Sequence, residues 1–249
     1  IERSKKKFRL TREGQVLYDY SKQIVATYES LHNQLQELKD IISGTIRLAT
    51  IYSIGLHQLQ PLVKKFLNKF PDTSTSLEYH PFDKIYEMVA RHEIDFGFVA
   101  YPVRKPGIVS ETFVEENLVF VRSPQQPVIK KKPTVLSDLN GLAFVAFTSN
   151  TPTRSAIDVF LRRHGSSPRI VSEYDNVETL KSAVILGIGA SIVPENTVRR
   201  ELAEGSLVSL PIKDLTLKRP LGILYPKSRS FNQTTQFFRD LVLENSPRN

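Results

Sequence analysis

The sequence predicts an α/β protein in which two Rossmann-like halves follow one long helix. Three observations lead to this fold class. Apolar residues recur at heptad spacing between residues 17 and 42, strands alternate with helices after residue 44, and the alternation starts again after a link rich in proline and lysine at residues 123–133. Because parallel strands need a crossover between them, usually a helix, such alternation indicates parallel sheets covered by helices.

Length and composition set limits on the function. A chain of 249 residues suits two small domains plus an extension, and no apolar run is long enough to span a bilayer. The absence of cysteine excludes disulfides, thiolate metal sites and iron–sulfur clusters, and it fits the cytoplasmic location that we expect. The five histidines are far apart, so we expect no metal site and no cofactor. Because Ile1 stands where Met is usual and no signal peptide follows, we expect that the natural N-terminus is missing.

The positive charge is concentrated at the N-terminal end. The first 12 residues hold six basic side chains against Glu2, a net +5 out of the +8 of the whole chain. Such a segment is typical of a contact with nucleic-acid phosphates, and a solvated tail is the alternative. The residues that we expect to contact the DNA backbone are Arg3, Lys5, Lys6, Lys7 and Arg9.

A long helix is predicted over residues 12–42. Thr11 is a suitable N-cap, and Ser43 and Gly44 are typical of a helix end. Two apolar series at seven-residue spacing form a stripe too narrow for a globular core, which indicates a coiled coil with another subunit. The residues expected in this dimerisation seam are Leu17, Ile24, Tyr28, Leu31, Leu35, Leu38 and Ile42.

The two halves have the same order of elements. In the first, strands are predicted at 45–50, 77–79 and 94–99, with helices marked by apolar residues at 56–70 and 85–89. In the second, strands are predicted at 142–147, 170–174 and 190–193, with helices around 157–164 and 177–184. A last strand at 221–225 and a helix around 237–242 could return to the first half, so that the chain crosses between the halves twice.

The strand-to-helix turns are the candidate binding sites. Ligands of open α/β sheets bind beyond the carboxyl ends of the strands, where helix N-termini present unpaired N–H groups. Ser53 follows the first strand of the first half, and Thr151 with Pro152 forms a strong helix start in the second. Two such helix ends with several hydroxyls and Arg154 would suit a small anion, whereas ordinary helix capping is the alternative. The expected ligand-binding residues are Tyr52, Ser53, Ala100, Thr148, Ser149, Thr151, Thr153 and Arg154.

Nothing in the sequence argues for catalysis. Gly187 and Gly189 stand between a helix and a strand, whereas a phosphate-binding loop needs the opposite order, so we interpret Gly187 as a helix C-cap. Neither a P-loop nor a G-x-S-x-G nucleophile motif occurs, and no pair of carboxylates has a telling spacing.

Several segments resemble the LysR-type transcription regulators. Phe8-Arg9-Leu10-Thr11-Arg12-Glu13-Gly14 resembles the R-x-L-T-x-x-G segment that closes their winged helix-turn-helix, and residues 1–3 look like the end of the recognition helix. The turn at 48–55 resembles their first effector-domain strand, Ile94-Asp95-Phe96-Gly97-Phe98 matches a later strand, and residues 186–194 are close to a G-x-G-h-x-h-h-P signature. The similarity runs from one end of the sequence to the other.

The resemblance implies a DNA-binding, oligomeric regulator whose effector domain has the periplasmic-binding-protein type II fold. It also implies that Ser53 and the loop 148–154 line the effector cleft. We therefore expect a winged-helix remnant at 1–11, a linker and dimerisation helix at 12–43, one effector subdomain at 44–123 with 225–249, and a second at 124–224. A periplasmic-type solute-binding protein is an alternative, although it would not need the heptad helix. An enzyme on the same bilobal fold is another, although clustered ionisable residues would then be expected.

Overall fold

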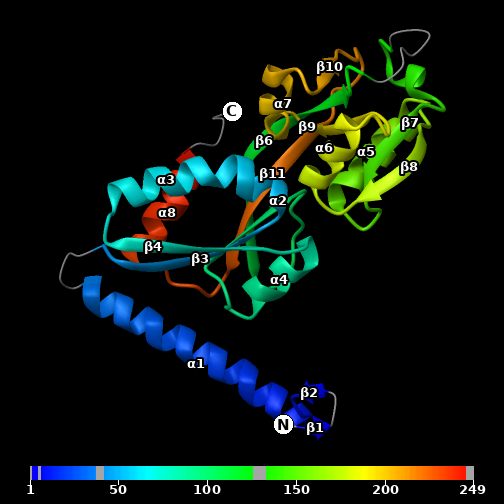
Figure 1. Ribbon diagram of the computed structural model, residues 1–249. Helices are drawn as coiled ribbons and strands as arrows, with labels where there is room; N and C mark the ends of the chain where they lie inside the picture. The colour runs from blue at the N-terminus through cyan, green and yellow to red at the C-terminus, as the bar shows by residue number, and fades with distance from the viewer. Residues whose placement is uncertain (1, 5–6, 38–41, 126–132, 245–249) are drawn as a thin grey trace.

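The computed structural model describes residues 2–4, 7–37, 42–125 and 133–244. Its body consists of two α/β lobes, and a long helix, α1, runs outside this body with a small hairpin at its far end (Figure 1). The heptad helix thus lies apart from the globular part, as its narrow apolar stripe requires.

The hairpin and α1 begin the chain. Strands β1 (Glu2–Ser4) and β2 (Lys7–Arg9) pair antiparallel, with Glu2 opposite Arg9. The expectation that residues 1–3 end a recognition helix is therefore wrong for Glu2 and Arg3, whose backbone groups face a partner strand, while Ile1 lies outside the described residues. Helix α1 spans Arg12–Glu37, and the Thr11 Oγ1 atom accepts a hydrogen bond of 3.0 Å from the Gly14 N–H, which confirms Thr11 as the N-cap.

The end of α1 differs from the prediction. The described helix stops at Glu37, and residues 38–41, including Leu38, lie outside the described part of the chain. Ile42 is not helical, so its expected place in the helical seam is wrong. The physical reason is the nearby strand β3 (Gly44–Thr50), whose first residue has φ +105°, a conformation that does not continue a right-handed helix.

Lobe I (residues 42–117 and 218–244) is built around a mixed sheet. Strands β3, β4 (Thr73–Tyr79) and β5 (Phe96–Ala100) are parallel, and β11 (Lys218–Pro226) joins β5 antiparallel. Helices α3 (Gln60–Lys69) and α8 (Gln233–Glu244) lie on one side of this sheet and α4 (Phe82–Ala90) on the other (Figure 1). The rings of Phe66 and Phe238 meet edge to face at 5.2 Å, so the last helix does pack on the first half.

Lobe II (residues 118–217) repeats the arrangement with a smaller sheet. Strands β7 (Ala143–Phe147) and β8 (Arg169–Tyr174) are parallel, while β9 (Ser191–Pro194) and β10 (Val208–Leu210) pair with the far half of β6. Helices α5 (Pro152–Arg163), α6 (Val177–Ile185) and α7 (Arg199–Glu204) surround them, with the 3-10 turns η2 (Leu136–Leu139) and η3 (Glu195–Thr197). Gly187, at φ +78°, ends α6 just after its C-cap residue, as expected.

Two long strands connect the lobes. Strand β6 (Ile108–Arg122), which the sequence analysis did not anticipate, runs from lobe I into lobe II, and β11 returns beside it. Leu118 and Phe120 belong to the core of lobe II, whereas Leu221 and Ile223 belong to that of lobe I. The chain therefore crosses a few residues earlier than the expected boundaries at 123 and 224.

Among the described residues, no helix combines the length and the apolar character that a bilayer crossing demands.

Candidate functional site

The first strand-to-helix turn of lobe I carries Tyr52 and Ser53. Helix α2 (Tyr52–Ile54) passes through a π-helical turn, η1 (Gly55–Leu59), directly into α3. A π turn widens the helix and turns its side chains out of the regular α-helical register, and such turns are frequent at functional sites. Here the turn carries His57 and Gln58, both of which contact groups beyond their own helix.

Gly55 allows the turn to lie close to the sheet. A Cβ atom at this position would be 2.5 Å from a ring carbon of Tyr79 and 2.6 Å from the Thr50 methyl carbon. The ring of Tyr79 stacks on that of Tyr52 at 4.9 Å between centroids. Tyr52 itself remains exposed, whereas Ser53 next to it is buried. The packing under the turn therefore fixes the position of the Ser53 hydroxyl.

The corresponding turn of lobe II begins α5. Thr151 is the N-cap, and its Oγ1 atom accepts a hydrogen bond of 3.3 Å from the Arg154 N–H, with Pro152 in the first turn. Thr148 is half-buried and its N–H donates to the Tyr174 carbonyl oxygen, while Ser149 is exposed. Thr153 is buried and is the member of this loop that faces lobe I, because it contacts Arg219 of β11.

Arg219 joins the two turns. Its Nη2 atom donates to the Ser53 Oγ atom at 2.8 Å, and its Nε atom donates to the Thr153 Oγ1 atom at 3.1 Å. The guanidinium is 2% exposed and forms an ion pair with Glu116 of β6. Ser53, Glu116, Thr153 and Arg219 are called the interlobe site below. One buried cation thus contacts a hydroxyl of each lobe.

Glu116 has partners in both lobes as well. It is 5% exposed, and its Oε2 atom accepts from the Gln58 amide of lobe I at 3.2 Å and from the Asn196 amide of lobe II at 3.4 Å. A carboxylate and a guanidinium removed from water need such additional hydrogen bonds, because their mutual attraction alone barely offsets their desolvation.

Tyr101 lies beside this pair in a strained conformation. It follows Ala100, the buried last residue of β5, and has φ +50°, which is rare for an aromatic residue. Its N–H donates to the Pro220 carbonyl oxygen at 2.8 Å and its hydroxyl to that of Lys218 at 3.2 Å. Burial raises the pKa of Tyr101 to about 12, with Glu116 adding to the rise and Arg219 opposing it. The phenol therefore stays neutral at physiological pH.

Arg154, an expected effector ligand, is held inside lobe II. Its Nε atom contacts both carboxylate oxygens of Asp158 at 2.8 and 2.9 Å, and its Nη1 atom donates to Glu173 at 2.5 Å and to the Phe147 carbonyl oxygen at 2.6 Å. Burial lowers the pKa of Arg154, but the hydrogen bonds from Glu173 and Asp158 outweigh it and raise the pKa. The guanidinium that meets both lobes is that of Arg219, not that of Arg154.

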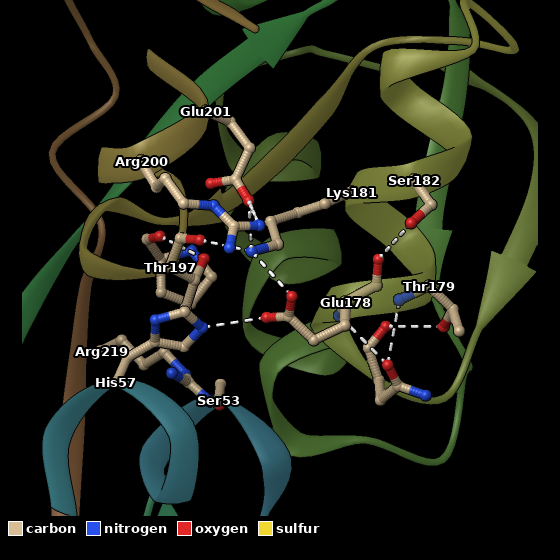
Figure 2. Close-up of polar contacts among 12 residues, drawn as sticks. Ser53, His57, Glu178, Thr179, Lys181, Ser182, Thr197, Arg200, Glu201 and Arg219 are labelled. Atoms are coloured by element: carbon tan, nitrogen blue, oxygen red, sulfur yellow. Dashed lines mark hydrogen bonds and ion pairs between the residues drawn. The ribbon is translucent and has the colours of Figure 1, made fainter. Parts of the chain in front are cut away.

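A second polar chain crosses between the lobes (Figure 2). The His57 Nε2 atom lies 2.9 Å from the Glu178 Oε1 atom at the start of α6, and the Lys181 Nζ atom lies 3.0 Å from the Glu178 Oε2 atom. Lys181 is buried and also contacts Glu201 at 3.0 Å. Contacts from the π turn of lobe I thus continue through three residues of lobe II, Glu178, Lys181 and Glu201.

The sequence missed Arg219 and Glu116. Both lie in strands that hold other charged residues, Glu115 beside Glu116 and Lys218 beside Arg219, so neither stands out in the sequence. They face each other directly across the ladder of β11 and β6, a register between strands about a hundred residues apart in the chain. No local pattern reports such a register.

The other predicted residues lie along the N-terminal part. Leu17, Ile24, Tyr28 and Leu31 project from α1 with exposed fractions of 52–69%, and Leu35 is helical. Arg3, Lys7 and Arg9 belong to the hairpin, whereas Lys5 and Lys6 fall outside the described residues. Within the described ranges, 2–4, 7–37, 42–125 and 133–244, no group of three or more His, Cys, Asp or Glu side chains could hold a metal ion.

Comparisons with known proteins agree with this architecture. Residues 39–247 match the family model of the LysR substrate binding domain. A probable RuBisCO transcriptional regulator of Emiliania huxleyi is 31% identical over 248 residues, which cover 97% of this chain and 79% of that protein.

Two solved structures share the fold. The Synechocystis PCC6803 CcmR regulatory domain, in complex with 2-PG, has a TM-score of 0.73 at 24% identity and covers 82% of this chain and 98% of that one. Full-length CbnR, complexed with its target DNA, has a TM-score of 0.75 at 19% identity and covers 97% and 83%. On the family match and the 31% identical relative, the chain belongs to the LysR family of transcriptional regulators, and its two lobes form the family's substrate-binding domain.

Proposed function

We propose that the interlobe site senses a small anionic metabolite and that its occupation controls transcription. The observation that carries this proposal is the pair of hydrogen bonds from Arg219 to Ser53 of one lobe and to Thr153 of the other. A ligand that enters between these groups touches both lobes at once. It therefore binds one relative arrangement of the lobes better than others and shifts the population toward it.

The chemistry of the surroundings favours an anion. Arg219 brings a positive charge, which Glu116 balances in the structure, and the N-terminus of α5, capped by Thr151, adds partly positive N–H groups at the boundary where Thr153 contacts Arg219. The two hydroxyls can each donate to or accept from a ligand oxygen. The related fold of the CcmR regulatory domain, solved with 2-PG, supports a small ligand.

The remaining parts of the proposal concern DNA and assembly. We expect the basic hairpin residues to contact DNA phosphates. Such contacts position a protein on DNA without reading the base sequence. The complex of CbnR with DNA supports this expectation. The apolar stripe of α1 is expected to pair with the same helix of a second subunit. A regulator that binds DNA works where the DNA is, so we propose a cytoplasmic location.

A thermal-shift screen tests the effector class. Small carboxylates, phosphates and sulfates should raise the melting temperature of the protein more than neutral or cationic metabolites at equal ionic strength, because a ligand selective for the folded state stabilises it. Ser53→Ala should weaken any anionic hit about tenfold, or ~1.4 kcal/mol, since one hydrogen bond is lost.

Ser76→Ala is the matched control, because Ser76 is an exposed serine on the edge strand β4. It should leave the response unchanged. If only neutral aromatic or cationic compounds stabilised the protein, the anion assignment would be wrong although the family would stand.

A further inference from the structure

The carboxylate of Glu116 occupies the place that an anionic ligand would take. It pairs with the buried Arg219 guanidinium and accepts hydrogen bonds from Gln58 of lobe I and Asn196 of lobe II. One cation and two amides, drawn from three separate elements, form a donor set suited to an oxyanion. In the structure this donor set is filled by the protein itself.

The position of Glu116 is fixed by the backbone. Glu116 and Arg219 are direct partners in the β6–β11 ladder, and both are buried. The pair therefore does not depend on flexible surface side chains. Without an effector, the carboxylate neutralises the guanidinium and, through Gln58 and Asn196, contacts both lobes.

We propose that Glu116 is an internal competitor of the effector: the effector's anionic group takes Arg219 from Glu116, with Ser53 and Thr153 as further contacts. This inference rests on the proposed function of the interlobe site. It also narrows the ligand class. A group that replaces or crowds a buried carboxylate must interact with the guanidinium more strongly than that carboxylate does, which favours a compact group of higher charge, such as a phosphate, over a single carboxylate.

The competition links binding to the arrangement of the lobes. When Arg219 turns to the ligand, Glu116 loses its counter-charge and keeps only the amides of Gln58 and Asn196, so it is held less firmly between the lobes. The same event that binds the ligand therefore weakens the interlobe contacts made by Glu116 and adds contacts made by the ligand. The signal arises from this exchange.

Titration calorimetry with inorganic phosphate at constant ionic strength tests the proposal on three proteins. Glu116→Gln keeps the shape and an acceptor oxygen but removes the competing charge, so it should bind phosphate at least tenfold more tightly than the unaltered protein. The double variant Glu116→Gln with Arg219→Gln removes both charges, which avoids an unpaired buried charge, and it should lose phosphate binding. Should Glu116→Gln fail to fold, Glu116→Asp keeps the charge, withdraws it from Arg219, and should also bind phosphate more tightly.

Glu111→Gln is the matched control. Glu111 lies on the same strand and pairs with Arg239 at 2.8 Å within lobe I, so its loss should leave phosphate affinity unchanged. Equal affinity in Glu116→Gln and the unaltered protein, or retained binding in the double variant, would overturn the inference. If in that case Ser53→Ala still weakened anionic hits, the proposed effector site would survive. Absence of phosphate binding in every variant would refute this inference, whereas the anion assignment would still be decided by the thermal-shift screen with carboxylates and sulfates.

Discussion

Lys181 is a buried amine whose partners lie within reach of all three of its N–H groups. Its Nζ atom donates to the Thr197 carbonyl oxygen at 2.7 Å and lies 3.0 Å from both Glu201 and Glu178. Burial alone would raise the pKa of Glu201, but the hydrogen bond and charge of Lys181 outweigh it and lower the pKa below its ordinary value of 4.5. The pair therefore stabilises lobe II while both groups are charged.

We predict that Lys181→Met lowers the free energy of unfolding by about 3 kcal/mol, because it removes the buried counter-charge of Glu201 and leaves only the exposed Arg200 at 3.2 Å. Urea denaturation measures the change. Lys84→Met is the control, since Lys84 and Glu87 form an exposed pair at 3.6 Å on α4 that is worth less than about 1 kcal/mol. Equal effects of the two substitutions would contradict the stabilising role of the buried pair.

The same pair predicts a pH dependence. Because the pKa of Glu201 is lower in the folded protein than in the unfolded chain, its contribution to stability is present above about pH 4.5 and is lost as the pH falls through the folded value. Lys181→Met removes this contribution. The difference in the free energy of unfolding between Lys181→Met and the unaltered protein should therefore shrink as the pH of the urea denaturation is lowered. A difference that does not change with pH would show that Glu201 is not the titrating group.

Part of the candidate site could be predicted from local patterns in the sequence. Ser53 and Thr153 could be chosen because a strand-to-helix turn is a local pattern, and Thr151 was recognisable as a cap. Arg154 was expected to bind the anion because it is positively charged. In the structure its guanidinium pairs instead with Asp158 and Glu173, both in lobe II. Arg219 could not be predicted as a site residue, because its role depends on Glu116, which lies opposite it on β6.

Helix α1 exposes an apolar stripe along its described residues. Four of its seam residues have side chains that are 52–69% exposed: Leu17, Ile24, Tyr28 and Leu31. Apolar side chains at heptad spacing on an isolated helix are stabilised when a second helix covers them. Assembly through α1 remains a prediction.

Leu31→Asp should weaken this assembly by about 100-fold or more, which is about 3 kcal/mol, since the seam would then bury an unpaired charge. Light scattering over a range of protein concentrations measures the effect. Gln23→Asp adds the same charge to the same helix at an exposed position outside the two heptad series, and it should leave the oligomer intact. An unchanged oligomer in Leu31→Asp would place the subunit contact elsewhere.

Regular elements were predicted well and irregular ones were not. The expected strands at 142–147 and 170–174 became β7 and β8 with a shift of one residue at their starts. Periodicity reports such elements because each has one buried face. The π turn at Gly55–Leu59 has no periodic signature, and the long strand β6 changes its partners midway, so neither shows one continuous pattern of burial.

Within the described residues, contacts between the lobes include the interlobe site and the contact of His57 with Glu178. The latter joins the π turn of lobe I to the first turn of α6 in lobe II. Both side chains are partly exposed, at 23% and 37%, so this contact contributes little to overall stability. Because the contact joins residues of different lobes, we expect it to affect the relative arrangement of the lobes more than the overall stability.

We predict that His57→Leu broadens the distribution of distances between the lobes while changing the melting temperature by less than about 2 °C. Because the chain has no cysteine, spin labels can be attached at Lys64→Cys in lobe I and Arg163→Cys in lobe II, both of which are exposed. Pulsed electron paramagnetic resonance then gives the distances. His80→Leu, which removes a contact with Glu78 inside lobe I, is the control and should leave the distribution unchanged. An identical distribution in His57→Leu would show that this contact does not restrain the lobes.

The pairing of β6 with β11 has a mechanical consequence. These two strands are the only covalent connections between the lobes within the described residues 42–125 and 133–244, and they are hydrogen-bonded to each other through Lys218↔Asn117 and onward. Sliding one past the other would break the ladder and turn every side chain to the opposite face. Twisting this two-stranded ribbon of β6 and β11 keeps its hydrogen bonds and its register. The ribbon therefore allows the lobes to rotate about it more readily than to slide along it, and the Arg219–Glu116 pair lies at the end of the ribbon next to lobe II.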